Sequence, residues 1–184
     1  MDWNLPNTLT WARIAVIPLI ILLFYMPYPW ADPAAGLLFA AAGVTDSLDG
    51  YFARRLGQIS RLGAFLDPVA DKLIVAVALV LLVSKDPRAL IVLTAIIIIG
   101  REITISALRE WMAEIGARRK VAVSQLGKYK TILQIIGLSM MLYRWPLFGL
   151  HTYAVGVVLT VVAAAATLVS MLVYLRAAWP ELKR

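Results

Sequence analysis

The sequence contains no cysteine, so it can form neither disulfide bonds nor thiolate metal sites. It contains one histidine, His151, so a nucleophile activated by histidine has little support, and we assign His151 no catalytic role. Acidic residues are also scarce: 11 of the 184, against 18 lysines and arginines, which gives a net charge of +7. Such a charge can indicate a nucleic-acid-binding protein, but the positions of the basic residues argue against one.

Apolar residues are abundant: they make up 61% of the chain, and the mean hydropathy is +0.81. A soluble domain carries about 45–50% apolar residues, so the core of a soluble protein of this size could not bury all the apolar residues of this chain. A helix that crosses a membrane needs about 20 residues, and apolar runs recur along the whole chain. We predict an all-α membrane protein, a single domain over 1–184, with six transmembrane helices after an interfacial N-terminal segment. The expected helices span 9–28, 35–55, 64–84, 89–110, 127–144 and 150–176.

Positive charge gathers in alternate connections of this expected bundle. The segment 54–63 has three arginines and 109–130 has six basic residues, whereas 28–34 has none, 84–88 has two and 144–151 has one. Cytoplasmic loops of membrane proteins are rich in lysine and arginine, so the basic connections and both termini are expected in the cytoplasm. The charge therefore indicates topology rather than nucleic-acid binding. A compact chain without a transit peptide favours a bacterial inner membrane.

Four of the acidic residues fall in one stretch, VTDSLDGYFARRLGQISRLGAFLDPVADKL. Asp46 and Asp49 are three apart, and Asp67 and Asp71 are four apart, so each pair shares a helix face. The segment between them is short, so the two helices should be antiparallel neighbours whose carboxylates meet at the cytoplasmic end. Four carboxylates repel one another unless cations lie between them, and oxygen ligands favour hard cations such as Mg²⁺, Mn²⁺ or Ca²⁺. The stretch thus predicts a metal site suited to pyrophosphate chemistry.

Small residues and an arginine follow the first acidic pair. Gly50 and Ala53 remove bulk where a nucleotide could approach the helix, and Arg54 can bind phosphate oxygens in bidentate fashion. Spacing alone leaves two alternative roles open for the aspartates. They could have only a structural role, as helix caps or in ion pairs with Arg54 and Lys72. Intramembrane carboxylates also line ion and proton transporters.

The acidic stretch fits the pattern D-x2-D-G-x2-A-R-x8-G-x3-D-x3-D, and through it the sequence resembles the CDP-alcohol phosphatidyltransferase family. The pattern is matched at every fixed position, namely Asp46, Asp49, Gly50, Ala53, Arg54, Gly63, Asp67 and Asp71. The resemblance extends over residues 4–175 and includes PNTLTWARIAVIP and REITISALREWMAEIGARRKVAVSQLGKYKT. It implies a six-helix bundle, usually a homodimer, with an active site at the cytoplasmic membrane surface.

The resemblance also implies roles for individual residues. The four aspartates would hold two divalent ions, Mg²⁺ or Mn²⁺, and Asp71 would also be the general base for the acceptor hydroxyl. The CDP portion of the lipid substrate would contact Asn7, Thr8, Gly50, Ala53 and Arg54.

The resemblance of the segment REITISALREWMAEIG implies that the phosphatidyl group of CDP-diacylglycerol is transferred to glycerol 3-phosphate. This acceptor is a dianion, and the candidate cations for its phosphate are Arg13, Arg101, Arg109 and Lys128. Lys130, two residues after Lys128, is expected to point in a different direction. Each of these side chains could instead extend to lipid headgroups. A sister transferase that uses serine, inositol phosphate or phosphatidylglycerol remains an alternative, as do a cation or proton transporter and a catalytically silent scaffold.

Overall fold

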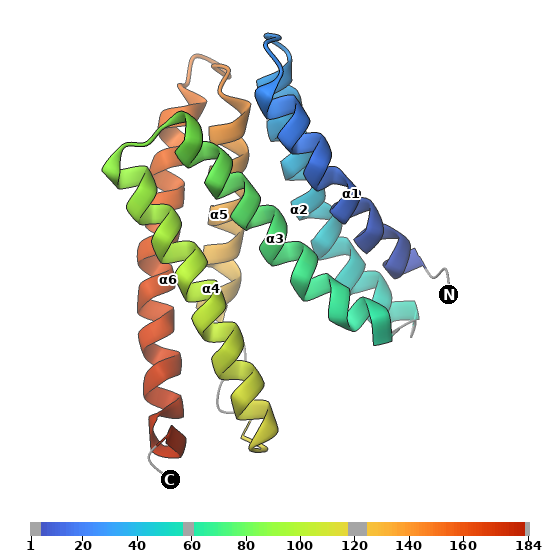
Figure 1. The fold of residues 1–184 in the computed structure, drawn as a ribbon, viewed down its shortest axis with the longest axis vertical. Coiled ribbons are helices and arrows are strands. Elements are labelled where there is room, and N and C mark those ends of the chain that lie inside the picture. Colours follow the sequence, from blue (N-terminus) through green and yellow to red (C-terminus); the bar gives the residue numbers. More distant parts are fainter. Residues whose placement is uncertain (1–4, 57–60, 118–124, 183–184) are drawn as a thin grey trace.

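The computed structural model describes residues 5–56, 61–117 and 125–182, and this part of the chain forms six α-helices. The helices are α1 (Leu5–Tyr25), α2 (Ala31–Leu56), α3 (Arg61–Lys85), α4 (Ala89–Glu114), α5 (Gln125–Tyr143) and α6 (Thr152–Leu182). Figure 1 shows the start of α1 and the end of α6 at the same end of the bundle. The connections 26–30, 86–88 and 144–151 lie together at the opposite end.

The predicted all-helical class agrees with the structure, but several predicted helix boundaries differ from it. The helix α2 begins at Ala31 rather than at 35, because Asp32 in its first turn favours a helix N-terminus. The helix α4 continues past 110 to Glu114 and ends before Gly116, whose φ of +73° suits a residue just beyond a helix. The helix α1 already begins at Leu5, so the segment expected along the interface is helical from that residue.

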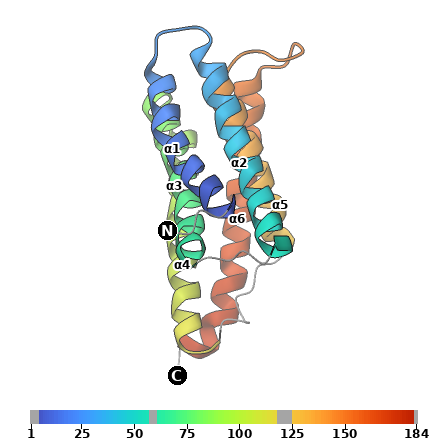
Figure 2. The ribbon, with the colours of Figure 1, turned by 90° about the vertical axis from the view of Figure 1, so that its right-hand side faces the viewer.

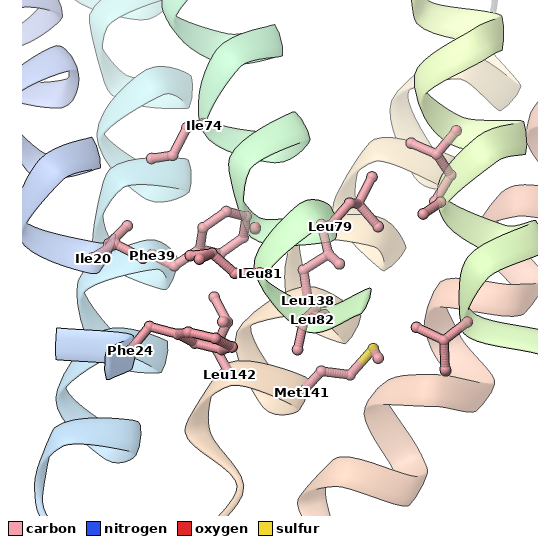
Figure 3. Packing of buried hydrophobic residues seen from close by; sticks show 14 of the residues in the cluster. Ile20, Phe24, Phe39, Ile74, Leu79, Leu81, Leu82, Leu138, Met141 and Leu142 are labelled. Carbon is pink, nitrogen blue, oxygen red and sulfur yellow. The ribbon is translucent and has the colours of Figure 1, made fainter. Parts of the chain in front are cut away.

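The largest cluster of buried apolar side chains lies in the half of the bundle near the three connections (Figure 3). Phe24 of α1, Phe39 of α2, Leu82 of α3 and Leu142 of α5 are at most 2% exposed. Figure 2 shows α2 running beside α5, so that these side chains meet from both sides. Close packing of this kind holds that half of the bundle in one arrangement.

Charged side chains are buried in the other half, near the start of α1 and the end of α6. Arg13, Arg101 and Lys130 are each at most 6% exposed. A smaller apolar cluster, which includes Met112 and Tyr174, packs α4 against α6 in this half. The helices therefore separate an apolar core from a polar end in which a site can form.

The helices α5 and α6 approach each other closely at two glycines. A Cβ atom on Gly137 would overlap Thr160 Oγ1 and would lie 2.9 Å from the backbone nitrogen of Thr160. A Cβ atom on Gly156 would lie 2.7 Å from the carbonyl oxygen of Gly137. Small residues allow such close backbone contacts between membrane helices, where lipid supplies no hydrophobic force to bring helices together.

Two helices of the described residues, α4 and α6, are long and apolar enough to cross a membrane. Shorter apolar helical stretches occupy Thr10–Tyr25 and Ala31–Thr45. Large apolar side chains are exposed on the outer surface, among them Leu22, Leu37, Val80, Ile96 and Val158. Soluble proteins rarely expose large apolar patches, so this surface indicates contact with lipid. The fold is that of a helical membrane protein.

Candidate active site

The four aspartates predicted as metal ligands lie on successive helices, Asp46 and Asp49 on α2 and Asp67 and Asp71 on α3. The end of α2 and the start of α3 lie at the polar end of the bundle (Figure 1). Several predicted site positions have side chains outside the described part of the structure, so their predicted roles stay predictions. These positions are Asn7, Asp46, Asp49, Gly50, Ala53, Arg54 and Lys128.

The helix α1 holds the two aspartates of α3. Thr10 Oγ1 donates a hydrogen bond to Asp67, and Arg13 Nη1 pairs with Asp71 Oδ1 at 2.5 Å. Thr10 and Arg13 are three apart on α1, and the aspartates are four apart on α3, so each pair lies on one helix face. Thr10 and Arg13 are 1% and 3% exposed, whereas the side chain of Asp71 is 39% exposed. The buried Arg13 therefore orients the Asp71 carboxylate, while part of the Asp71 side chain stays accessible from the protein surface.

This arrangement places Arg13, predicted for the acceptor phosphate, beside the predicted base. Thr10 was not predicted as a site residue, although it lies in the segment PNTLTWARIAVIP through which part of the family resemblance runs. Thr8, predicted to lie near the nucleotide, is exposed near the start of α1.

The donor chemistry of the aspartates fits a hard divalent cation, because Mg²⁺ and Mn²⁺ prefer oxygen ligands. Two of the four carboxylates, Asp67 and Asp71, have described side chains, one helical turn apart. Within the described residues no group of three or more Asp, Glu or His side chains comes together, so this part of the chain holds at most half of the predicted ligand set. The Arg13 guanidinium beside Asp71 shows that a positive charge is accommodated at this position.

A second group of charged residues lies where α4, α5 and α6 meet, and we name it the cationic cluster. Arg101 Nη1 donates to Glu102, and Lys130 Nζ is 3.7 Å from the same carboxylate. Arg109 and Tyr174 lie within electrostatic range of the Lys130 ammonium. Arg109 Nη2 donates to Tyr174 Oη at 3.4 Å, with the guanidinium carbon 5.2 Å from the centre of the tyrosine ring. Two cations, Arg101 and Lys130, thus contact the Glu102 carboxylate, and a third, Arg109, lies near Lys130.

Among the described residues, the cationic cluster has more positive than negative charge and contains buried donors without acceptors. Arg101 and Lys130 are 6% and 4% exposed. The Nε atoms of Arg101 and Arg109 are buried and have no hydrogen-bond partner among the described residues. Buried charges and buried donors are costly unless they are compensated. A phosphate dianion supplies both the missing charge and several acceptor oxygens, so the cluster is suited to a phosphorylated ligand.

The cluster contains predicted and unpredicted residues. Arg101 and Arg109 were predicted for the acceptor phosphate, and the structure brings both to it. Lys130, rather than its predicted neighbour Lys128, is the lysine whose side chain is described there. Tyr174 gave no signal in the sequence, because one tyrosine in an apolar helix is common in membrane proteins.

A mainly apolar groove of about 330 Å³ runs between α3 and α4. Its apolar walls include Leu73 of α3 and Ile99 of α4, and its charged members are Lys72 and Glu102. Lys72 directly follows Asp71 in the sequence, and Glu102 belongs to the cationic cluster. The groove therefore borders the cationic cluster at Glu102, and two of its lining residues, Pro68 and Lys72, directly follow Asp67 and Asp71 in α3.

Comparison with known protein families identifies the family of this chain. The profile of the CDP-alcohol phosphatidyltransferase family matches residues 3–175. The chain belongs to the CDP-alcohol phosphatidyltransferase family. The matched range contains the four aspartates, the residues of α1 that contact two of them, and the whole cationic cluster. The family resemblance expected from the spacing of the aspartates is thereby confirmed.

Similarity to individual family members extends over nearly the whole chain. A protein from Pseudomonas fluorescens named CDP-diacylglycerol–glycerol-3-phosphate 3-phosphatidyltransferase is 51% identical over 181 residues, which are 98% of this chain and 92% of that protein. A protein of the same name from Escherichia coli (strain K12) is 50% identical over 182 residues. One from Shigella flexneri serotype 5b (strain 8401) is 49% identical over the same length. Both alignments cover 99% of this chain and 98% of the relative.

Proposed function

We propose that the protein transfers the phosphatidyl group of CDP-diacylglycerol to glycerol 3-phosphate and releases CMP. The observation that carries this proposal is the identity of 50% and 51%, over nearly the full length, to relatives named for this reaction. The cationic cluster supports the acceptor, because its buried excess of positive charge matches a phosphate dianion. Serine carries no net charge and would leave the excess uncompensated.

We further propose that all six helices span a bacterial inner membrane, that the active site faces the cytoplasm, and that the protein is a homodimer, as the family resemblance implies. The basic residues support this orientation, because the connections at the polar end carry far more lysine and arginine than those at the opposite end. The lipid substrate then reaches the site from the bilayer. The groove between α3 and α4 can take one of its acyl chains, with Lys72 near the phosphates.

The proposed chemistry is a single displacement. The primary hydroxyl oxygen of glycerol 3-phosphate forms a bond to the phosphorus of the phosphatidyl group. The bond from this phosphorus to the bridging oxygen of the pyrophosphate breaks, and CMP leaves with that oxygen. The hydroxyl proton passes to a carboxylate oxygen of Asp71. The product, phosphatidylglycerophosphate, stays in the membrane.

The protein contributes mainly positioning and electrostatic stabilisation. Arg101, Arg109 and Lys130 would bind the acceptor phosphate, and Arg13 would orient Asp71. Gly50, Ala53, Arg54, Asn7 and Thr8 would contact the CDP portion. Asp46, Asp49, Asp67 and Asp71 would hold two Mg²⁺ or Mn²⁺ ions, which when bound neutralise the pyrophosphate and stabilise the leaving group.

Release of CMP by the purified protein tests the proposal. The assay offers CDP-diacylglycerol with glycerol 3-phosphate, serine, inositol phosphate or phosphatidylglycerol, with and without a chelator. We expect release with glycerol 3-phosphate alone, its loss with the chelator, and its return with excess Mg²⁺. Release only with another acceptor would exclude the proposed acceptor. Ion flux into liposomes without CMP formation would favour a transporter instead.

The role of Asp71 has its own test. Asp71→Asn should abolish turnover even with metal in excess, because the amide cannot accept the hydroxyl proton. Activity at the wild-type level in this variant would exclude Asp71 as the base.

A further inference from the structure

A pocket opens at the end of the bundle opposite the aspartates, where the connections 86–88 and 144–151 lie together. It has a volume of about 340 Å³ and is lined by Lys85, Asp86, Arg144 and Tyr153. These residues come from the end of α3, the connection after it, the residue that follows α5, and the first turn of α6. The proposed reaction uses none of them.

Most charges around this pocket have partners within the protein. Asp86 accepts hydrogen bonds from Arg88 at 2.7 and 2.8 Å and from Tyr153 Oη at 2.5 Å. The Arg88 guanidinium and the Tyr153 hydroxyl hold the pKa of Asp86 well below its usual range, so this carboxylate is ionised. Lys85 Nζ pairs with Asp32 at 3.2 Å. With Arg144 included, three basic and two acidic side chains leave one net positive charge.

Arg144 differs from its neighbours because no carboxylate among the described residues pairs with it. Its guanidinium lies over the ring of Tyr153, 5.3 Å from the centre, and its Nε is buried without a hydrogen-bond partner in the described structure. Its φ of +59° is in the left-handed region, which is unfavourable for a residue with a Cβ atom. The fold therefore holds an arginine at this pocket in a strained conformation, with a buried donor that no described protein acceptor uses.

The connection after Arg144 presents an apolar hairpin. The backbone nitrogens of Leu147 and Leu150 each donate to the carbonyl oxygen of the other residue, at 3.1 and 2.9 Å. The two residues between them, Phe148 and Gly149, have φ of +52° and +78°. Positive φ at both central residues defines a type I′ turn, in which a phenylalanine is unfavourable. Phe148 is nevertheless 94% exposed, so no packing within the described structure compensates for its strain.

The surroundings of this turn indicate the depth at which it lies in a membrane. Trp145, Leu147 and Leu150 are also exposed, at 48%, 46% and 58%. Tryptophan and other aromatic residues gather at the level of lipid headgroups, and exposed apolar side chains are stabilised among lipid chains. With the six helices spanning the membrane as proposed above, the hairpin would lie with the Arg144 pocket at the level of the lipid phosphates.

We propose that this pocket binds the headgroup of an anionic phospholipid, with its phosphate at Arg144 and with the Phe148 hairpin inserted among the lipid chains beside it. An arginine binds phosphate oxygens in bidentate fashion, and one phosphodiester balances the single net positive charge of the pocket. The apolar hairpin favours a lipid over a free anion, because a water-soluble phosphate needs no apolar neighbour. The lipid supplies the negative charge that no described carboxylate provides for Arg144 and the apolar surroundings that Phe148 lacks.

Thermal unfolding of the purified full-length protein in detergent tests this inference. The probes are short-chain phosphatidylglycerol, inorganic phosphate and free glycerol phosphate. Arg144→Gln removes the proposed contact, and Arg176→Gln, at an exposed arginine of α6, is the matched control. We expect phosphatidylglycerol to stabilise the wild type and the control alike. Arg144→Gln should need at least about tenfold more lipid for the same stabilisation.

Phe148→Asn provides a second measurement, because asparagine tolerates positive φ and the substitution removes only the apolar tip. This variant should be stabilised less by phosphatidylglycerol than the wild type. Equal lipid responses of the wild type and Arg144→Gln would overturn the proposal, since they would indicate binding elsewhere, such as at the active site. Stabilisation by inorganic phosphate that is as large as that by the lipid, and that Arg144→Gln abolishes, would also overturn it. If Arg144→Gln does not fold, an unchanged lipid response of Phe148→Asn decides against the proposal.

Discussion

Replacing Gly137 with alanine should destabilise the protein, although alanine is the better helix former. The added Cβ atom would overlap Thr160 Oγ1 and would lie 2.9 Å from Thr160 N and 3.0 Å from the carbonyl oxygen of Gly156. Ordinary contact begins near 3.4 Å, and two of these three atoms belong to the backbone of α6. Rotation of a side chain therefore cannot relieve the overlap, and α5 and α6 would have to move apart by several tenths of an ångström.

The expected loss of stability can be worked from these contacts. Overpacking of a close-packed site costs about 1–3 kcal/mol. Turning Thr160 away would also break the 2.8 Å hydrogen bond from its hydroxyl to Gly156 O. The helix preference of alanine offsets roughly 0.5–1 kcal/mol of this cost, so we expect a net loss of about 1–2 kcal/mol. Gly100→Ala is the matched control, because its Cβ atom would meet nothing within 4 Å.

Thermal unfolding of both variants in one detergent, followed by the loss of monodisperse protein on size-exclusion chromatography, provides the comparison. Gly137→Ala should unfold below the wild type, and Gly100→Ala at or above it. A Gly137→Ala variant as stable as the wild type would refute the close approach of α5 and α6 and the overlap expected from it.

Three further predictions concern the two ends of the bundle. Lys130→Gln should raise the KM for glycerol 3-phosphate in the CMP-release assay by about 10- to 100-fold, because a charged contact to the phosphate is lost; an equal rise in the KM for CDP-diacylglycerol would contradict this role. Tyr174→Phe should raise the same KM by a smaller factor, because Arg109 loses its hydroxyl partner but keeps the ring, and an unchanged KM would show that the hydroxyl does not position Arg109. Asp86→Asn should lower the unfolding midpoint at neutral pH, since the depressed pKa of Asp86, due mainly to Arg88, stabilises the fold above the ordinary value of 3.8. This stabilisation is lost as the pH falls, so the difference in unfolding midpoint between Asp86→Asn and the wild type should shrink only below about pH 4. A difference in midpoint that already shrinks between about pH 7 and pH 5 would refute the assignment.

Spacing within one helix was enough to predict part of the candidate site. Arg101 and Arg109 are eight apart on α4, and this spacing predicted that they share a face. The four aspartates were likewise predicted from their spacing, and they lie on neighbouring ends of α2 and α3. Such predictions work because the helical period alone determines which residues face the same way.

Contacts between helices could not be predicted in this way. The contact of Lys130 with Glu102 depends on the rotation of α5 about its axis, which its packing against α6 determines. The partner of Arg13 is Asp71 on another helix, and no pattern within α1 indicates it. Tyr174 reaches the cationic cluster only because α6 packs against α4. Each of these positions depends on how the helices pack against one another, and the helical period carries no information about that packing.

The close contact of α5 and α6 also bears on how acceptor specificity could change during evolution. Lys130 lies two helical turns before Gly137 on the same face, so the place of its ammonium group depends on a backbone contact with no room for a larger residue. Arg101 and Arg109 stand on α4, where the neighbouring Gly100 has open space around it. A descendant that accepts another alcohol should therefore have diverged first in α4, while its α5 and α6 keep the ancestral glycines.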